Sequence, residues 1–572
     1  MSTPPPPPSQ GGGTIDVKPS TLHQVAGGFA GQQTPYDKAA KTLLTKLKEY
    51  PDAGGYGTAS QAFAASYLKV GNRFLEVWAR SVASIGGAAV GFAVTANNYS
   101  RAEAANDASG KTKAQTQPPP VVIDKVPDYG SVPDLKWGDD DGGDDFIRSL
   151  LEWVPDLLWD VIRPLLEHAF RWGKVAEVYP FPQQHYLNSL SQAWADTTIS
   201  LSMTESGLTG LVSSITQQSN SEWYDAMRAF CSSLWGTTAW GGSTANYEWK
   251  HDSSANRTAS HPVMTVLFDT AKKVSDLLRD FAEAAVDLNG KVWDIYMKAV
   301  RQAVGNVDLS DGVDLKDLKE GAKGVGRFLK GLAKGGAELS AEITLSIDTA
   351  ALNAVVEEYN RRVNALVPQL DRLSSALEEA HRSAPTYAAE EARAEAFGAR
   401  ALNDFKNEHR YTTDDDEKNH FYAVDLANAE GLYGGHSVDK HVGKTDEQLA
   451  QRLRDQQVVR PDGSVRPEAA SSFKDLASAQ RLTQSTLDDI GNAEKIERWL
   501  DRLERQPVAN ERSTLTLDKT YADVTGRTVT RDSYDRDGLR ASGSDTHGVN
   551  VVLRYKRGLV PPFIVLTSMP TA

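Results

Sequence analysis

Apolar residues recur at helical spacing along most of the first part of the chain. They step by three or four from Ile15 to about Glu49 and again from Phe63 to Val77, and the stretch YPDAGGYGTAS between them carries the proline and glycines that end helices. The pattern predicts two long helices that form an antiparallel hairpin over residues 14–105. The small-residue run SVASIGGAAVGFAVTA predicts close helix packing, and no apolar run reaches the length that predicts a transmembrane helix.

Two later segments carry a sustained heptad pattern. Apolar residues step alternately by four and three from Val274 to Ala299 and again from Leu352 to Leu377. This period is typical of long packed helices or a coiled coil. The region from residue 146 is also rich in tryptophan, which we interpret as helix packing. These tryptophans are Trp153, Trp159, Trp172, Trp194, Trp223, Trp235 and Trp240.

Proline, glycine and charged runs divide the chain into segments. The predicted order is a disordered leader (1–13), the helical hairpin (14–105), a linker (106–145), a second helical module (146–305), a glycine-rich hinge (306–338), a long helical or coiled-coil region (339–410), a linker (411–430) and a C-terminal domain (431–572). The hinge holds GAKGVGRFLKGLAKGGAE, which is basic and weakly amphipathic. Membrane contact by residues 324–340 is the alternative to a flexible hinge.

The pattern changes after about residue 410, where strand-like alternation replaces helical spacing. GRTVTR and NVVLRYKR alternate polar and apolar residues, and PPFIVLT is typical of a short buried strand. Arg557 and Gly558 are placed to join the last two strands as a hairpin. The predicted fold class is therefore multidomain, with all-α N-terminal and central regions followed by a C-terminal α+β domain.

Composition narrows the classes of protein to consider. The chain has 572 residues, 40% hydrophobic and 24% charged, with one cysteine, Cys231, which excludes an intramolecular disulfide framework and a cysteine-rich zinc site. The leader MSTPPPPPSQGGG lacks the basic and apolar regions of a signal peptide. Residues 431–572 hold 21 basic and 20 acidic side chains, so this domain is nearly neutral, whereas the whole chain has a net charge of −14. Nucleic-acid contact would therefore have to come from a local patch.

The stretch GGHSVDKHVGKTDEQLAQR, residues 434–452, concentrates the candidate chemistry. It does not match a phosphate-binding P-loop, because Val438 stands where that motif needs its first glycine. A metal site is also disfavoured. His436 and His441 are five residues apart, so they would not share a helix face, and no carboxylate or thiol accompanies them at ligand spacing.

An acid–base site is compatible with the spacing of the same stretch. Thr445 followed by Gln448 predicts a capping box and a helix start, which places Arg452 about two turns, or roughly 10 Å, into the helix. His441 precedes the cap, where Gly443 allows the chain to fold back. A neutral imidazole and a fixed cation would then face one phosphate. The alternative is a capped surface helix with solvated charges.

Five separated blocks of the C-terminal segment resemble the bacterial RNase A-like toxin domain of contact-dependent inhibition proteins. They are GGHSVDKHVGKTDEQLAQRL, SSFKDLASAQ, IERWL, GRTVTR and FIVLTSMP, and the resemblance covers residues 431–572. It implies a disulfide-free α+β fold with antiparallel sheets, like pancreatic ribonuclease, and metal-independent RNA cleavage by 2′-OH attack. The implied catalytic residues are His441, Arg452 and Thr567.

Met569 stands where that family usually has a tyrosine, and a thioether cannot donate a proton. The group that protonates the leaving oxygen therefore has to be another one. Lys440, His436 and His547 are the candidates. We favour Lys440 because it adjoins His441, against the alternative of a solvated lysine.

The N-terminal hairpin resembles WXG-type substrates of type VII secretion. In NNYSRAE, Tyr99 and Glu103 match the Tyr-x3-Asp/Glu secretion signal, although GGYG occupies the turn where the family prefers Trp-x-Gly. A Trp-Gly-Gly occurs at 240–242, and residues 176–304 resemble a second helical module of actinobacterial members. The resemblance implies export through the type VII machinery, with small helical WXG proteins as partners.

Together the resemblances imply a secreted antibacterial polymorphic toxin that acts in the cytoplasm of a target cell. Its expected substrate is RNA, with tRNA as one candidate, and not DNA. No cofactor or metal is expected, and a cognate immunity protein is expected to cover residues 431–572. The alternative is a helical interaction or scaffold protein with a degenerate toxin-like tail. A third class, ADP-ribosyltransferase, lacks its arginine, Ser-Thr-Ser and glutamate series here.

Overall fold

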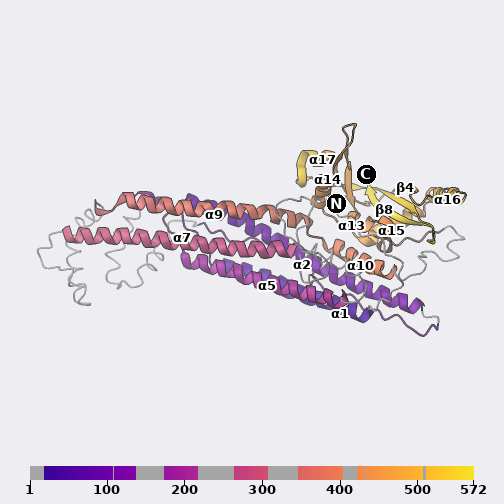
Figure 1. Ribbon diagram of the computed structural model, residues 1–572, viewed down its shortest axis with the longest axis horizontal. Coiled ribbons are helices and arrows are strands. Elements are labelled where there is room, and N and C mark those ends of the chain that lie inside the picture. The colour runs from indigo at the N-terminus through magenta and orange to yellow at the C-terminus, as the bar shows by residue number, and fades with distance from the viewer. Residues whose placement is uncertain are drawn as a thin grey trace.

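A computed structural model describes residues 18–106, 109–136, 173–216, 263–306, 345–403, 421–430, 432–506 and 510–572. These form a long helical body and an α+β domain that lies on one end of it (Figure 1). The predicted fold class is confirmed. Several predictions concern residues outside the described ranges. They are the hinge at 306–338, membrane contact at 324–340 and the Trp-Gly-Gly at 240–242. Of the tryptophans named above, the described residues include Trp194 alone.

The helical body buries one face of each long helix in a shared core. Its elements are α1 (Pro19–Lys48), α2 (Thr58–Asn106), η2 (Gly173–Glu177), α5 (Gln184–Thr216), α7 (Val263–Asn306) and α9 (Thr349–Ser383). The heptad positions Val274, Phe281 and Leu352 are fully buried there, so both heptad predictions of long packed helices are confirmed. Trp194 is also buried, and its Nε1 donates to the Tyr67 hydroxyl at 3.1 Å.

The small-residue run of α2 packs closely, as the sequence predicts. A Cβ at Gly91 would lie 2.6 Å from the Cβ of Ala394, and one at Gly87 would overlap the carbonyl of Tyr387. By length and composition alone, Thr58–Ala105 could cross a membrane, which differs from the sequence expectation. However, 89% of its most apolar window is buried inside the protein, so here α2 serves as a core helix.

Part of the predicted linker at 106–145 is packed on the body. The side-chain amide of Gln33 donates to the Ile123 carbonyl at 2.9 Å and accepts from the Ile123 N–H at 2.8 Å. Val132 and Leu135 are buried in the helical core. The segment 109–136 therefore runs along the helices as an extended strap.

The region at 339–410, predicted as long helical or coiled-coil, holds two helices within its described residues 345–403. α9 ends at Ser383, and a second helix, α10 (Tyr387–Asn403), begins beyond Pro385. Ala392 and Ala396 of α10 are buried in the core of the C-terminal domain. A short helix, α12 (Leu426–Ala429), contributes to the same core.

The C-terminal domain combines helices with small antiparallel sheets. Its remaining elements are η4 (Leu432–Gly434), α13 (Ser437–His441), α14 (Asp446–Asp455), β1 (Val458–Val459), β2 (Val465–Arg466), β3 (Ala469–Ser472), α15 (Leu476–Leu487), α16 (Ile490–Glu504), β4 (Thr514–Thr520), β5 (Gly526–Thr530), α17 (Arg531–Asp537), η5 (Gly538–Arg540), β6 (Ser544–Thr546), β7 (Gly548–Tyr555) and β8 (Phe563–Thr571). The two larger sheets have the strand orders β3-β5-β6 and β4-β7-β8. β7 and β8 pair as the predicted hairpin, with Gly558 at φ +86° in the turn.

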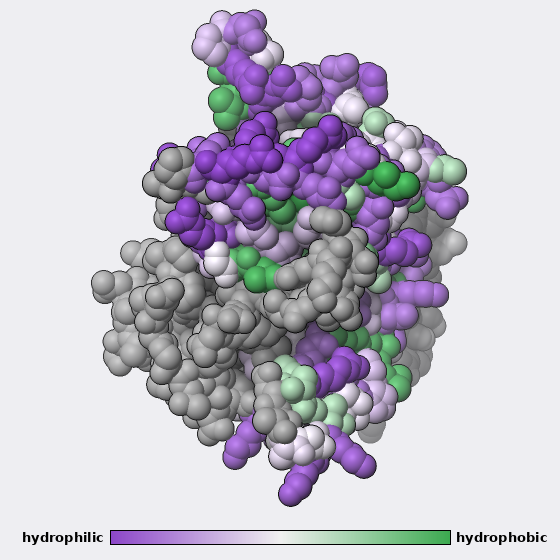
Figure 2. Space-filling model, turned by 90° about the vertical axis from the view of Figure 1, so that its right-hand side faces the viewer, coloured by the Kyte–Doolittle hydropathy of each residue, from purple (hydrophilic) through white to green (hydrophobic). Residues whose placement is uncertain are grey.

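The surface of the C-terminal domain is mainly polar. Figure 2 views the end of the molecule on which this domain lies, and its upper part is largely hydrophilic with small separate apolar areas. The β1–β2 hairpin projects from the domain and exposes Val458 and Val459 (Figure 1). The site described next lies at the base of this projection, where α13 and α14 meet β3 and β8.

Candidate active site

His441 is the last residue of α13 and is only 2% exposed. Its Nδ1 lies 2.9 Å from the carbonyl oxygen of Ser471, which can only accept, so Nδ1 carries the proton and Nε2 keeps a free lone pair. Burial lowers the pKa of His441 well below that of a free imidazole, and the Arg452 cation lowers it further, while the bond to Ser471 opposes this. The ring is therefore a neutral base near pH 7.

The chain reverses direction directly after His441. The His441 carbonyl accepts from the Phe473 N–H at 2.8 Å, and the Gly443 N–H donates to the Phe473 carbonyl at 3.0 Å, which ties this segment to the end of β3. Gly443 has φ +65°, a conformation that favours glycine. Thr445 then caps α14 with the predicted capping box to Gln448. The predicted fold-back and helix start are both confirmed.

Arg452 lies on α14 and reaches back to α13. Its Nη1 donates to the carbonyl of Lys440 at 3.1 Å, and its Nε donates to Oε1 of Gln456 at 3.1 Å. These bonds hold the guanidinium beside the residue that precedes His441. Burial lowers the pKa of Arg452, but a guanidinium stays charged at any physiological pH. The structure therefore brings a neutral base and a fixed cation together, as the spacing predicts.

Two of the three candidate proton donors lie at this site. Burial lowers the pKa of Lys440, and the Arg452 cation lowers it further. His436 donates from Nδ1 to the Gly434 carbonyl at 2.8 Å, and its pKa is also lowered, mainly by burial. His547 is exposed between β6 and β7, where its carbonyl accepts from the Tyr521 N–H at 2.7 Å, and no hydrogen bond among the described residues joins it to His441.

Strand β8 brings Thr567 to the start of α13. The Leu566 carbonyl accepts from the His436 N–H, and the Ser568 N–H donates to the Ser437 hydroxyl, both at 3.0 Å. Thr567 is 9% exposed, and its hydroxyl has no hydrogen-bond partner among the described residues. This hydroxyl is therefore buried with an unused hydrogen-bonding capacity. Met569 lies two residues along the strand, on the same face and half-buried.

The proposed secretion signal lies far from this site, near the end of α2. Tyr99 is 6% exposed and belongs to the helical core, whereas Glu103 is exposed.

Sequence reasoning missed the groups that orient the site. The Ser471 and Gly434 carbonyls select the histidine tautomers, and neither position carries a local sequence signal. It also missed Glu430, whose carboxylate accepts from the N–H groups of Val438 and Asp439 at the start of α13. Among the described residues, no group of three or more His, Cys, Asp or Glu side chains is arranged to hold a metal ion.

Comparison with protein families agrees with the resemblance of this end of the chain to RNase A-like toxin domains. The model of the family described as bacterial CdiA-CT RNAse A domain matches residues 435–570. A solved structure, a CdiA-CT/CdiI complex from Y. kristensenii 33638, matches with 23% sequence identity and a TM-score of 0.19, over 24% of this chain and 100% of that chain. No curated protein matches. The C-terminal region therefore carries a CdiA-CT RNase A-like toxin domain.

Proposed function

We propose that the C-terminal domain is a metal-independent endoribonuclease and that the whole chain is a secreted antibacterial toxin. The observation that carries the catalytic part is the neutral, buried His441, oriented through Ser471 and placed beside the Arg452 cation. A base of this kind, next to a fixed phosphate-binding group, is suited to attack by the ribose 2′-OH. The match to the CdiA-CT RNase A domain supports the same reaction.

In the proposed step, Nε2 of His441 takes the proton of the 2′-OH. The 2′-oxygen bonds to phosphorus, the bond from phosphorus to the 5′-oxygen breaks, and a 2′,3′-cyclic phosphate forms. Negative charge on the non-bridging oxygens is met by the Arg452 guanidinium and by the free hydroxyl of Thr567.

The leaving 5′-oxygen needs a proton, which Met569 cannot supply. We assign this to Lys440, because burial and the Arg452 cation lower its pKa and make it a stronger acid than a free lysine. His436 is the alternative only as an imidazolium, because in the neutral form its proton is on Nδ1, bound to the Gly434 carbonyl, and its lowered pKa favours that form. Both lie next to His441 and Arg452 in the fold.

For delivery, we propose export through a type VII machinery with Tyr99 and Glu103 as the signal, and action on RNA in the cytoplasm of the target cell. A producer of such a ribonuclease also needs an inhibitor. We propose an acidic cognate immunity protein that covers the cleft of residues 431–572, because the site presents Lys440 and Arg452.

The test uses the full chain, RNA and a chelator of divalent metals. We expect RNA to be cleaved and single-stranded DNA, which lacks the 2′-OH, to stay intact. His441→Ala should lower the rate by about 10²–10⁴-fold, the usual contribution of a general base. His185→Ala, at an exposed position on α5, is the matched control and should cleave like the wild type. Intact RNA at high protein concentration would favour the alternative of a scaffold with a degenerate tail.

A further inference from the structure

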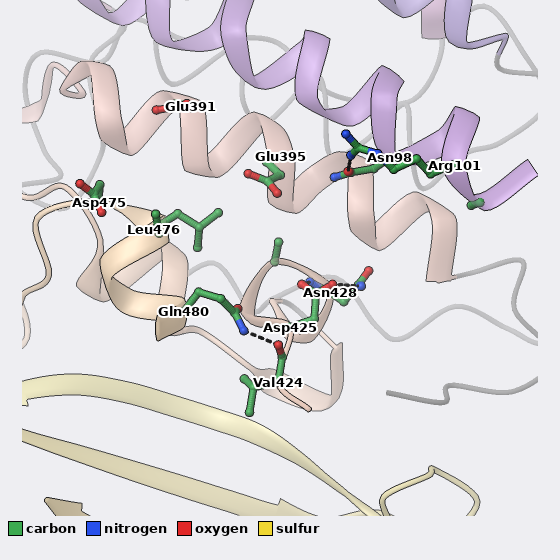
Figure 3. Close-up of a pocket in the computed structure, with 13 residues that line it drawn as sticks. Asn98, Arg101, Glu391, Glu395, Val424, Asp425, Asn428, Asp475, Leu476 and Gln480 are labelled. Carbon is green, nitrogen blue, oxygen red and sulfur yellow. Dashed lines mark hydrogen bonds between the residues drawn. The ribbon is translucent and has the colours of Figure 1, made fainter. Parts of the chain in front are cut away.

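Helix α10 lies between the helical body and the C-terminal domain. On one side it packs along α2, and on the other it contacts α12 and α13. Figure 3 shows α10 between α2 and the α12 and α15 segments, with the Glu395 carboxylate directed toward the space between them. Glu391 and Glu395 both line this open pocket of about 740 Å³. α10 precedes the matched residues 435–570, yet it contributes Ala392 and Ala396 to the core of this domain.

The N-terminal end of α10 contacts the chain directly after the proposed base. The Thr386 hydroxyl donates to the Gly443 carbonyl at 2.6 Å and also accepts from the Ala389 N–H at 3.1 Å. A Cβ at Gly443 would lie 2.7 Å from the backbone nitrogen of Ala389. Because Gly443 follows His441 by two residues, this contact sets the position of the end of α13.

The next turn of α10 contacts α13 itself. Arg393 lies 3.2 Å from a carboxylate oxygen of Glu390 and 3.5 Å from one of Asp439, which precedes His441 by two residues. Glu390 is fully buried, and burial raises its pKa to about 7 although the Arg393 and Lys444 cations oppose this. The Arg393–Asp439 pair joins α10 to α13, but the Asp439 side chain is 57% exposed, so this pair contributes little on its own and adds to the Thr386 bond.

Glu430 holds the other end of α13. Its two carboxylate oxygens accept from the backbone N–H groups of Val438 at 2.8 Å and Asp439 at 3.0 Å. Burial, and then the Asp439 charge, raise the pKa of Glu430 to about 8, while the two N–H donors oppose this. α13 has only five residues, so these external bonds replace stabilisation that a longer helix supplies itself.

We propose that α10 and Glu430 position the catalytic segment 437–444, so that the active unit of the toxin begins near Thr386 and not at the start of the matched domain. The proposal rests on the ribonuclease function proposed above. Thr386, Arg393 and Glu430 are positioning residues, because they act through the backbone of this segment. Because α10 also packs on α2, the helical body helps to fix the position of the catalytic segment through this helix.

The test uses full-length variants that remove single contacts at little steric cost. Thr386→Val removes the hydroxyl that binds Gly443, and Thr386→Ser restores it. Glu430→Gln keeps the shape but leaves only one oxygen to accept two N–H groups, and it is compared with the wild type above pH 8, where Glu430 is ionised. The matched controls are Thr349→Val and Glu504→Gln, at exposed positions on α9 and α16.

We expect Thr386→Val and Glu430→Gln to lower kcat by about tenfold or more with little change in KM, since a displaced base slows chemistry more than binding. In Thr386→Val the acid limb of the pH profile should also move to higher pH, because burial is the main cause of the low His441 pKa and a loosened segment admits water. Thr386→Ser should restore both values. A merely destabilised fold would lower the rate at every pH without moving the limb.

The outcomes separate the two proposals. If the wild-type chain leaves RNA intact, the ribonuclease function fails, and the positioning role fails with it. If the wild type cleaves RNA and both variants match their controls in kcat and in the acid limb, only the positioning role is overturned. Thermal unfolding of each variant shows whether the chain is folded under the conditions of the assay.

Discussion

Arg452 gives the sharpest quantitative prediction about the site. Two of its three guanidinium nitrogens are used inside the protein, Nη1 on the Lys440 carbonyl and Nε on Gln456, each at 3.1 Å. Among the described residues, Nη2 has no hydrogen-bond partner, so it is the nitrogen available to a phosphate. We compare Arg452→Lys, which keeps the charge, with Arg452→Met, which removes it and keeps much of the length.

The lysine variant isolates the geometry of the contact. A lysine ammonium is a single point of charge, so at this position it cannot reproduce both the hydrogen bond to the Lys440 carbonyl and the hydrogen bond to the phosphate. The lost bond to a charged phosphate oxygen is worth about 1.5–3 kcal/mol, which corresponds to roughly 10- to 150-fold in kcat/KM. The retained positive charge keeps the pKa of His441 low, so the acid limb of the pH profile should stay in place.

The methionine variant also tests the electrostatics. After burial, the Arg452 cation is the largest cause of the low His441 pKa, so its removal should raise that pKa. The base works only when neutral, and activity falls as the pH drops through its pKa. The acid limb should therefore move to higher pH in Arg452→Met and not in Arg452→Lys.

The assay is cleavage of a short fluorescent RNA, with kcat/KM measured from about pH 4 to pH 8, across the range in which histidine titrates. Thermal unfolding serves as the check that each variant is folded. A rate for Arg452→Lys within twofold of the wild type, or an acid limb that stays in place in Arg452→Met, would refute the assigned role.

Three further predictions concern the base, the acid and delivery. Because the pKa of His441 is depressed in the folded state, this residue contributes to stability above its unfolded pKa of about 6.5, and the contribution is lost as the pH falls toward the folded pKa. Urea unfolding over this pH range should therefore show a smaller loss of stability in His441→Asn than in the wild type. Met569→Tyr should raise the cleavage rate if the proton-donor role is vacant, whereas Lys440→Ala should lower it sharply if Lys440 fills that role. Tyr99→Ala should keep the protein inside the producing cell, and unchanged export in a secretion assay would contradict the signal.

Local patterns predicted the long helices and the start of α14. The heptads around Val274 and Leu352 report burial of one helix face, and Thr445 with Gln448 forms a cap within four residues. Such features depend on neighbours in the sequence, so periodicity and side-chain chemistry suffice to find them. The β7–β8 hairpin was predictable for the same reason.

The surroundings of His441 depend on contacts between distant segments. Its tautomer is selected by the Ser471 carbonyl, 30 residues away, and β8 reaches α13 through a bond between Ser568 and Ser437 that spans 131 residues. No local pattern encodes such pairings. Thr567 entered the site only through the family resemblance.

The break before α10, inside the region at 339–410 predicted as long helical or coiled-coil, left a signal in the sequence. Pro385 disfavours a helix at the residue before it, and Thr386 can cap the helix that follows. The structure uses both, since the Thr386 hydroxyl accepts from the Ala389 N–H. The docking of α10 onto α13 had no such signal, because Arg393 and Asp439 are far apart in the sequence.

The chemistry of the cut ends tests the proposed function most directly. The full chain is incubated with an RNA in chelator, the cut site is mapped, and the same RNA is made with one 2′-deoxynucleotide at that site. Attack by the 2′-OH predicts 2′,3′-cyclic phosphate and 5′-hydroxyl ends on the all-ribose strand, and loss of cleavage at the deoxy position. Cleavage at the deoxy position, or 5′-phosphate ends, would contradict the role of His441 as the base for the 2′-OH.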